Sequence, residues 1–134
     1  MSSGKALLGL RVLGRFMSVR TRIDREPLPA LAARLGNLPH TGRAHEPAAR
    51  LSRAVDRTLR FGPDRPTCLT RALVLYSLLR EQGDPAVLAI GLPEGAHDQT
   101  AHAWVELEGA DVGPRPGRGG HVALARFGDE PHVT

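Results

Sequence analysis

The chain has 134 residues, enough for about one ordinary domain, so a multi-domain assembly within the chain is excluded. Hydrophobic residues make up 41% of it and charged residues 24%, which is close to the globular average and argues against disorder or a fibrous repeat. The single cysteine, Cys68, excludes both an internal disulfide and a zinc site built from paired thiolates.

The net charge of +4 is unevenly distributed along the chain. Residues 1–60 hold twelve Lys or Arg against four Asp or Glu, a balance of +8, whereas residues 61–134 have a balance of −4. A basic half can face nucleic acid, an anionic membrane surface or an acidic partner, although scattered arginines most often form a solvated helical face. The acidic second half disfavours nucleic acid, and an acidic peptide or protein fits at least as well.

The first predicted element is a helix over Lys5–Met17, because its apolar residues recur at spacings of three and four. On this spacing Arg11 and Arg15 face outward, and they interrupt the apolar stretch too often for a secretory signal. No run of about 18 apolar residues occurs anywhere in the chain. We therefore expect no membrane span and a cytoplasmic location.

Two further helices complete the first half. Prolines on either side confine one to the neighbourhood of Ala30–Leu35, and Gly36 and Asn37 stop it. Pro47 opens the other, Ala48–Leu59, whose apolar residues repeat every fourth position. The first 60 residues are thus predicted to be helical and basic.

The second half changes to a mixed pattern. Thr67 can cap a helix that Gly83 ends, with one apolar face of Leu69, Ala72, Leu73, Tyr76 and Leu79. A buried strand is expected over Ala86–Leu92, between two prolines.

The rest of the second half is predicted to be strand and turn. A hairpin follows, with strands at Ala101–Leu107 and Ala110–Gly113 around a turn at Glu108 and Gly109. PRPGRGG is a loop, and HVALARF is either a strand or a short helix. The fold class is therefore α+β, with N-terminal helices and a small antiparallel sheet.

Cys68 lies at the start of the helix that Thr67 caps. Unpaired amides and the positive end of the helix dipole stabilise an anion there, so a thiolate is favoured at this position. A lone cysteine is nevertheless most often a small buried hydrophobe, and a catalytic role requires a second group.

His102 is the candidate for that group. Strand alternation places His102, Trp104 and Glu106 on one face, so an imidazole and an indole would share a partly apolar pocket in which Trp104 contacts substrate. An imidazole in that pocket can take the thiol proton. The same sequence pattern is also compatible with a structural histidine that is buried in the core and hydrogen-bonded there. The other histidines are expected to be solvated: His40, His45, His97, His121 and His132.

Phosphate-loop, dinucleotide-binding and metalloprotease motifs are all missing from the sequence, so we expect neither a cofactor nor a metal. The segments RPTCLTRALVLYSLLREQGDPAVLAIGL and AHAWVELEG, in this order, resemble the transglutaminase-like cysteine protease of lasso peptide biosynthesis, the B protein. The resemblance spans residues 47–128. It implies a transglutaminase-like or papain-like core in which Cys68 is the nucleophile and His102 its base.

A chain of this length resembles the stand-alone form of that protease, which removes the leader from a precursor peptide. The resemblance implies three partners: the precursor, a separate leader-recognition protein and a lasso cyclase that closes the ring afterwards. We expect one domain over residues 1–134, with a basic helical region at 1–60 and the catalytic core at 61–134.

The third catalytic residue is where the sequence departs from the family. An aspartate is usual about a dozen residues beyond the histidine, but here that count reaches Pro114 and Arg115. Asp111 is the nearest carboxylate, and with a turn at Glu108 it faces Glu106, roughly 13 Å from His102. Asp111 is therefore either brought closer to His102, where it acts as the third catalytic residue, or it is a surface acid of the turn. In the second case a backbone carbonyl or amide can orient His102 instead. A catalytically weak paralogue that only scaffolds peptides is the alternative function.

Overall fold

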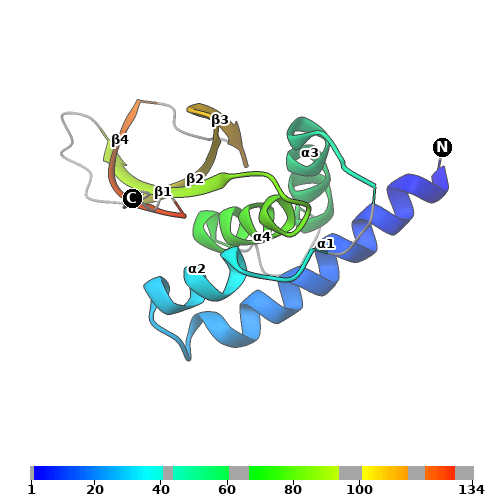
Figure 1. The fold of residues 1–134 in the computed structure, drawn as a ribbon, viewed down its shortest axis with the longest axis horizontal. Helices are drawn as coiled ribbons and strands as arrows, with labels where there is room; N and C mark the ends of the chain where they lie inside the picture. Colours follow the sequence, from blue (N-terminus) through cyan, green and yellow to red (C-terminus); the bar gives the residue numbers. More distant parts are fainter. Residues whose placement is uncertain (1, 41–43, 61–66, 94–100, 115–119, 129–134) are drawn as a thin grey trace.

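The computed structural model describes residues 2–40, 44–60, 67–93, 101–114 and 120–128. In these ranges helices come first and an antiparallel sheet follows, which confirms the predicted α+β class (Figure 1). The elements are α1 Ser2–Ile23, α2 Leu28–Gly36, α3 Ala48–Leu59, α4 Cys68–Glu81, β1 Ala86–Pro93, β2 His102–Leu107, β3 Ala110–Gly113 and β4 His121–Phe127. The described helices include none with the length and apolarity that a bilayer crossing requires.

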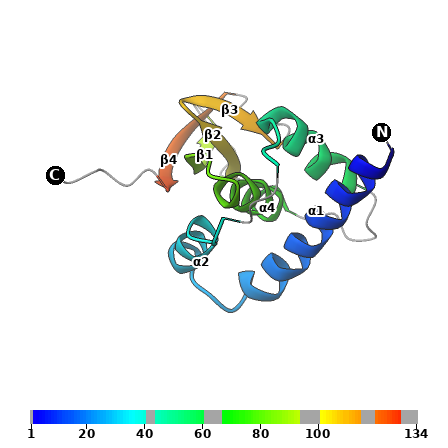
Figure 2. The same ribbon diagram turned by 45° about the vertical axis from the view of Figure 1, so that its right-hand side comes forward.

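Helix α4 is the centre of the molecule. The Thr67 hydroxyl oxygen accepts from the Thr70 amide at 3.1 Å at its start, and Gly83 adopts a left-handed φ of 97° after its end, both as the sequence predicts. Every side chain from Ala72 to Leu79 is buried, because α1, α2, α3 and the sheet pack on different sides of α4 (Figures 1 and 2). The sequence predicts that only one face of this helix is buried, whereas in the structure its middle is buried on all sides.

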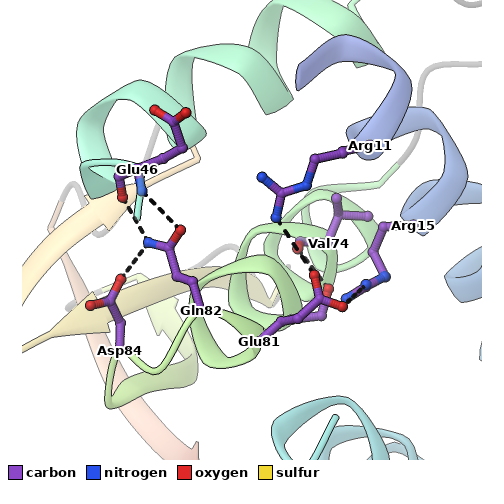
Figure 3. A network of polar contacts seen from close by, with 8 residues as sticks. Arg11, Arg15, Glu46, Val74, Glu81, Gln82 and Asp84 are labelled. Atoms are coloured by element: carbon purple, nitrogen blue, oxygen red, sulfur yellow. Dashed lines mark hydrogen bonds and ion pairs between the residues drawn. The ribbon is translucent and has the colours of Figure 1, made fainter. Parts of the chain in front are cut away.

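Helix α1 is longer than predicted and is turned differently. Arg11 and Arg15 point inward, where both pair with the buried carboxylate of Glu81 on α4, so their predicted outward direction is wrong (Figure 3). Glu81 would be a costly unpaired charge in this position, and two guanidinium groups compensate it. The turn of the helix leaves four large apolar side chains on the outside: Leu7, Leu10, Leu13 and Met17.

The other two predicted helices are confirmed. Helix α3 has the predicted bounds and begins directly after Pro47. Helix α2 begins two residues earlier than predicted, because Pro29 is accommodated in its first turn, where an amide hydrogen has no helical acceptor. Both helices bury their apolar faces against α4.

The sheet has the strand order β3-β2-β1-β4, with every neighbouring pair antiparallel. Leu107 pairs with Ala110 across the predicted turn, in which Glu108 and Gly109 have φ of 52° and 84°. These positive values at both central residues suit a tight hairpin. HVALARF is the strand β4, not a helix, and it pairs with β1 along the opposite edge.

A tyrosine and an arginine tie the end of α4 to two distant segments. A Cβ on Gly36 would come within 2.5 Å of the buried Tyr76 hydroxyl oxygen, and one on Gly128 within 2.7 Å of the same atom. Arg80 donates to the carbonyl oxygen of Gly36 at 3.1 Å and to that of Ala86 at 3.4 Å. Glycine at both positions therefore lets α2 and the end of β4 approach Tyr76 closely.

Candidate active site

Cys68 is the first residue of α4, directly after the Thr67 cap. Its side chain is partly exposed and packs against the hydrophobic core between the helices and the sheet. The first-turn amides of a helix lack acceptors within the helix, so they can stabilise negative charge at this end. The position is thus suited to stabilising an oxyanion formed beside the thiol.

The side chains of strand β2 alternate between the two faces of the sheet. Ala103 and Val105 belong to the core that contacts the helices. The intervening residues, His102, Trp104 and Glu106, are also buried and face the other side of the sheet, as the alternation predicts. The sheet therefore lies between the bulk of α4 and the His102 and Trp104 rings.

A second histidine belongs to this cluster. The His121 ring, from β4, lies with its centroid 4.8 Å from that of His102 and 6.2 Å from that of Trp104. His102 and Trp104 are themselves 6.2 Å apart with stacked rings. Gly91 pairs with His102 on the intervening strand β1 and has no side chain, so rings from β2 and β4 can meet across it.

The sequence does not single out His121, because HVALARF alone does not show which strand it joins. His121 can be placed only when β4 is known to pair with β1 as its second antiparallel neighbour. In that pairing Pro93 lies opposite His121. His121 then falls at the same end of the sheet as His102, which pairs with Gly91. Its predicted assignment as an ordinary solvated side chain differs from this half-buried contact with two rings.

Glu106 holds the tryptophan in place. The Trp104 indole Nε1 donates to Glu106 Oε2 at 3.0 Å, and Arg126 Nε donates to Glu106 Oε1 at 2.9 Å. Trp104 is fully buried, so in this conformation it presents its ring to the two histidines and no surface to a substrate. Its contact role is therefore with His102.

Asp111 is not brought to His102. It pairs with Glu106 across the hairpin, as predicted, four residues along β2 from His102, and its side chain is exposed. Four residues of strand correspond to roughly 13 Å. Its Oδ1 accepts from the Gly113 amide at 2.8 Å, which makes Asp111 part of the turn of the chain into residue 114.

The remaining histidines lie away from this cluster or outside the described residues. His40 and His45 are exposed, and His45 pairs with Asp84 at 2.9 Å. His97 and His132, and most of the predicted PRPGRGG loop, fall outside the described residues. No three His, Cys, Asp or Glu side chains within the described ranges gather as a metal site would require.

The chain path relates Cys68 to His102. Arg80, in the last turn of α4, donates to the carbonyl oxygen of Ala86, so β1 starts beside that end of the helix. His102 pairs with Gly91, five residues further along β1, which is roughly 16 Å away. Cys68 is twelve residues before Arg80 along α4, roughly 18 Å away. Both residues are therefore distant from the end of α4 that carries Arg80.

Comparison with known proteins identifies the family of the chain. A family model described as the transglutaminase-like superfamily matches residues 8–123, from α1 into β4. Comparisons with the curated proteins and with the solved structures gave no significant match. The family match includes the helix that carries Cys68, the strand that carries His102 and the basic helices before them. The chain therefore belongs to the transglutaminase-like superfamily.

Proposed function

We propose that this protein is a cysteine peptidase in which Cys68 is the nucleophile and His102 its base, and that it removes the leader from a lasso peptide precursor. The observation that carries the proposal is the capped helix start at Cys68, in a superfamily member that also has a buried histidine at the start of β2. The superfamily includes cysteine proteases, which supports the reaction class. The lasso precursor as substrate rests on the resemblance of the CLTRAL and AHAWVE segments.

The chain path supports a meeting of the two groups at one end of the sheet. His102 is the first residue of β2 and Cys68 the first of α4, so neither is enclosed within the middle of its element. Because the sheet lies between most of α4 and the imidazole, the proposed pairing requires the two side chains to meet around the strand end. Cys68 is partly exposed, as the approach of a peptide requires.

In the proposed reaction His102 takes the proton from the Cys68 thiol, and the thiolate attacks the carbonyl carbon of the scissile peptide bond. First-turn amides of α4 other than that of Thr70, which donates to the Thr67 hydroxyl, stabilise the resulting oxyanion. The carbon–nitrogen bond breaks, and the imidazolium of His102 gives its proton to the leaving amine of the core peptide. Water then hydrolyses the thioester and releases the leader as a carboxylic acid.

The orientation of His102 is proposed to come from its aromatic neighbours. In a cysteine–histidine pair a third group holds the imidazole in the useful direction, and aspartate or asparagine is usual. Here Asp111 is four residues away along the strand, whereas His121 and the Glu106-anchored Trp104 contact the imidazole. We assign His121 and Trp104 as positioning residues for His102.

The test is cleavage of a lasso peptide precursor in the presence of a leader-recognition protein. Cys68→Ala and His102→Ala are each expected to reduce core release by on the order of a thousandfold or more. Cys68→Ser is the matched variant, since it keeps the size of the side chain and removes only the thiol. Full residual cleavage by Cys68→Ala would sink the assignment.

A peptide-binding scaffold without peptidase activity is the second candidate, and the placement of Asp111 beside Glu106 favours it. The rate at which iodoacetamide alkylates Cys68 distinguishes the peptidase from the scaffold, because a thiol paired with a base reacts well below pH 8. A peptidase loses that fast reaction in His102→Ala. A scaffold shows slow alkylation that His102→Ala does not change, together with intact precursor after incubation.

A further inference from the structure

The outward face of α1 is uncharged and apolar over three turns. Four large side chains on it are exposed by 44% to 64%: Leu7, Leu10, Leu13 and Met17. The charged residues in this stretch, Arg11 and Arg15, are turned toward Glu81, so the helix presents its apolar side to the outside. Figures 1 and 2 both show α1 along the rim of the molecule. An exposed contiguous apolar face of this kind marks a docking surface.

Gly14 makes a hollow in the middle of this face. Leu10, Leu13, Gly14 and Met17 are spaced as the four residues that form the hole for one knob in helix packing. A Cβ added at Gly14 would meet nothing within 4 Å, so the hole is open. A large apolar side chain from a second helix fits such a hole, which gives the surface a defined shape.

A groove of about 710 Å³ runs along the same helix. Its lining includes Leu7, Leu10, Gly14, Arg11, Arg15 and Glu81. In this groove two guanidinium groups share the single carboxylate of Glu81, which leaves an excess of positive charge (Figure 3). The side chains of Arg11 and Arg15 are 14% and 17% exposed and line the groove. Glu46, which also lines the groove, pairs with Arg50 at 3.4 Å.

The charge of α1 decides between occupants. The segment from Ser2 to Ile23 holds one Lys and four Arg and no Asp or Glu. A second copy of the same helix would add five more basic residues and no carboxylate beside this groove, so it would leave the excess positive charge uncompensated. A lipid surface would not need a knob-sized hole. Carboxylates on a helix would compensate the excess positive charge of the two guanidinium groups.

We propose that α1 docks an acidic amphipathic helix of a partner protein, which places a large apolar side chain over Gly14 and carboxylates toward Arg11 and Arg15. The proposal rests on this surface and not on the peptidase reaction. It is therefore tested without cleavage.

The probe is a fluorescein-labelled amphipathic helical peptide of about 18 residues, with leucine along its seam and glutamate beside it. Binding to the full chain is measured by fluorescence anisotropy, against the same peptide carrying lysine in place of glutamate. We expect the glutamate peptide to bind at least tenfold more tightly. Leu10→Glu and Gly14→Leu are each expected to weaken its binding about tenfold or more, the first by charge and the second by filling the hole.

Leu124→Glu is the matched control, because Leu124 is 68% exposed on β4 and Leu10 is 64% exposed on α1. It is expected to bind the glutamate peptide as the unaltered chain does. Equal binding of the two peptides, or unchanged binding in Leu10→Glu, would overturn the proposal. Two other results would also overturn it: Leu10-dependent binding to phosphatidylglycerol vesicles without peptide binding, or a dimer in sedimentation velocity that Leu10→Glu dissociates.

Discussion

Gly91 shows how a missing side chain shapes the site. It lies on β1 between His102 on β2 and Ala123 on β4, and the three strands can bring their ring-bearing residues together because nothing projects from Gly91. A Cβ there would come within 2.2 Å of the Val122 carbonyl oxygen and 2.8 Å of the Trp104 ring. The backbone atom cannot yield as a side chain can, so the strand pair itself would have to move.

Gly91→Ala is therefore expected to destabilise the protein by about 1–3 kcal/mol, the usual cost of overpacking. Urea unfolding followed by circular dichroism measures the free energy of unfolding. Gly14→Ala is the control at an open helical position and is expected to stabilise by about 0.5–1 kcal/mol, because alanine is the better helix former. An unchanged free energy of unfolding in Gly91→Ala would contradict the close approach.

His121 is expected to affect turnover more than binding. Replacing it with alanine removes the ring that lies 4.8 Å from His102, and kcat should fall by on the order of tenfold while KM stays near its original value. His121→Gln keeps a polar group of similar reach and should recover part of kcat. A loss of equal size in both variants, or a change confined to KM, would show that His121 does not position His102.

At the scale of elements, local signals account for most of what the sequence could predict. Thr67 and Gly83 fix the ends of α4, and Glu108 with Gly109 fixes the hairpin register, because caps and tight turns depend on neighbours in the chain. Local signals did not predict which side of α1 faces the core. Arg15 pairs with Glu81, which is 66 residues away along the chain, and the spacing of apolar residues within α1 does not reveal such a distant partner.

The same limit applies to the candidate site. Cys68 at a helix start and His102 beside Trp104 follow from capping and alternation within single elements. His121 joins them only through the pairing of β4 with β1, which sequence spacing leaves undetermined. The displacement of Asp111 could be predicted, since it depends only on the length of one turn.

The pairing of α1 with α4 makes Glu81 a point of high sensitivity. Glu81→Gln would leave two guanidinium groups, each less than one fifth exposed, without their counter-charge. We expect a loss of about 2–4 kcal/mol in the free energy of unfolding, measured by urea titration. Glu26→Gln is the control, because its partners Arg22 and Arg34 are 43% and 54% exposed, and it should cost less than about 1 kcal/mol. Equal losses in the two variants would contradict a special role for Glu81.

At the scale of the whole molecule, the basic and acidic halves share one hydrophobic core. The buried cluster takes residues from Leu8 on α1 through Leu75 on α4 to Val105 on β2. The family match likewise begins within α1 and ends within β4. The positive helices are therefore attached rigidly to the sheet that carries His102, and a partner held by the helices has a fixed position relative to that sheet.

Charge reversal on α3 tests whether this basic side attracts substrate. The triple variant Arg53→Glu, Arg57→Glu and Arg60→Glu changes exposed residues, and it should raise the apparent KM for the presented precursor about tenfold with little change in kcat. The triple lysine variant keeps the charge and should behave as the unaltered chain. Unchanged kinetics in the glutamate variant would exclude an electrostatic contribution from α3.

The contact of Tyr76 with Gly36 and Gly128 restricts the order in which this protein can change during evolution. A side chain at Gly36 would collide with the tyrosine hydroxyl, so this position is open to change only after Tyr76 has become smaller. Gly128 stays restricted even then, because its φ is 93° and an added Cβ would also lie 3.0 Å from the carbonyl oxygen of Ala86. Gly36 and Tyr76 are 40 residues apart along the chain, and they constrain each other's replacement.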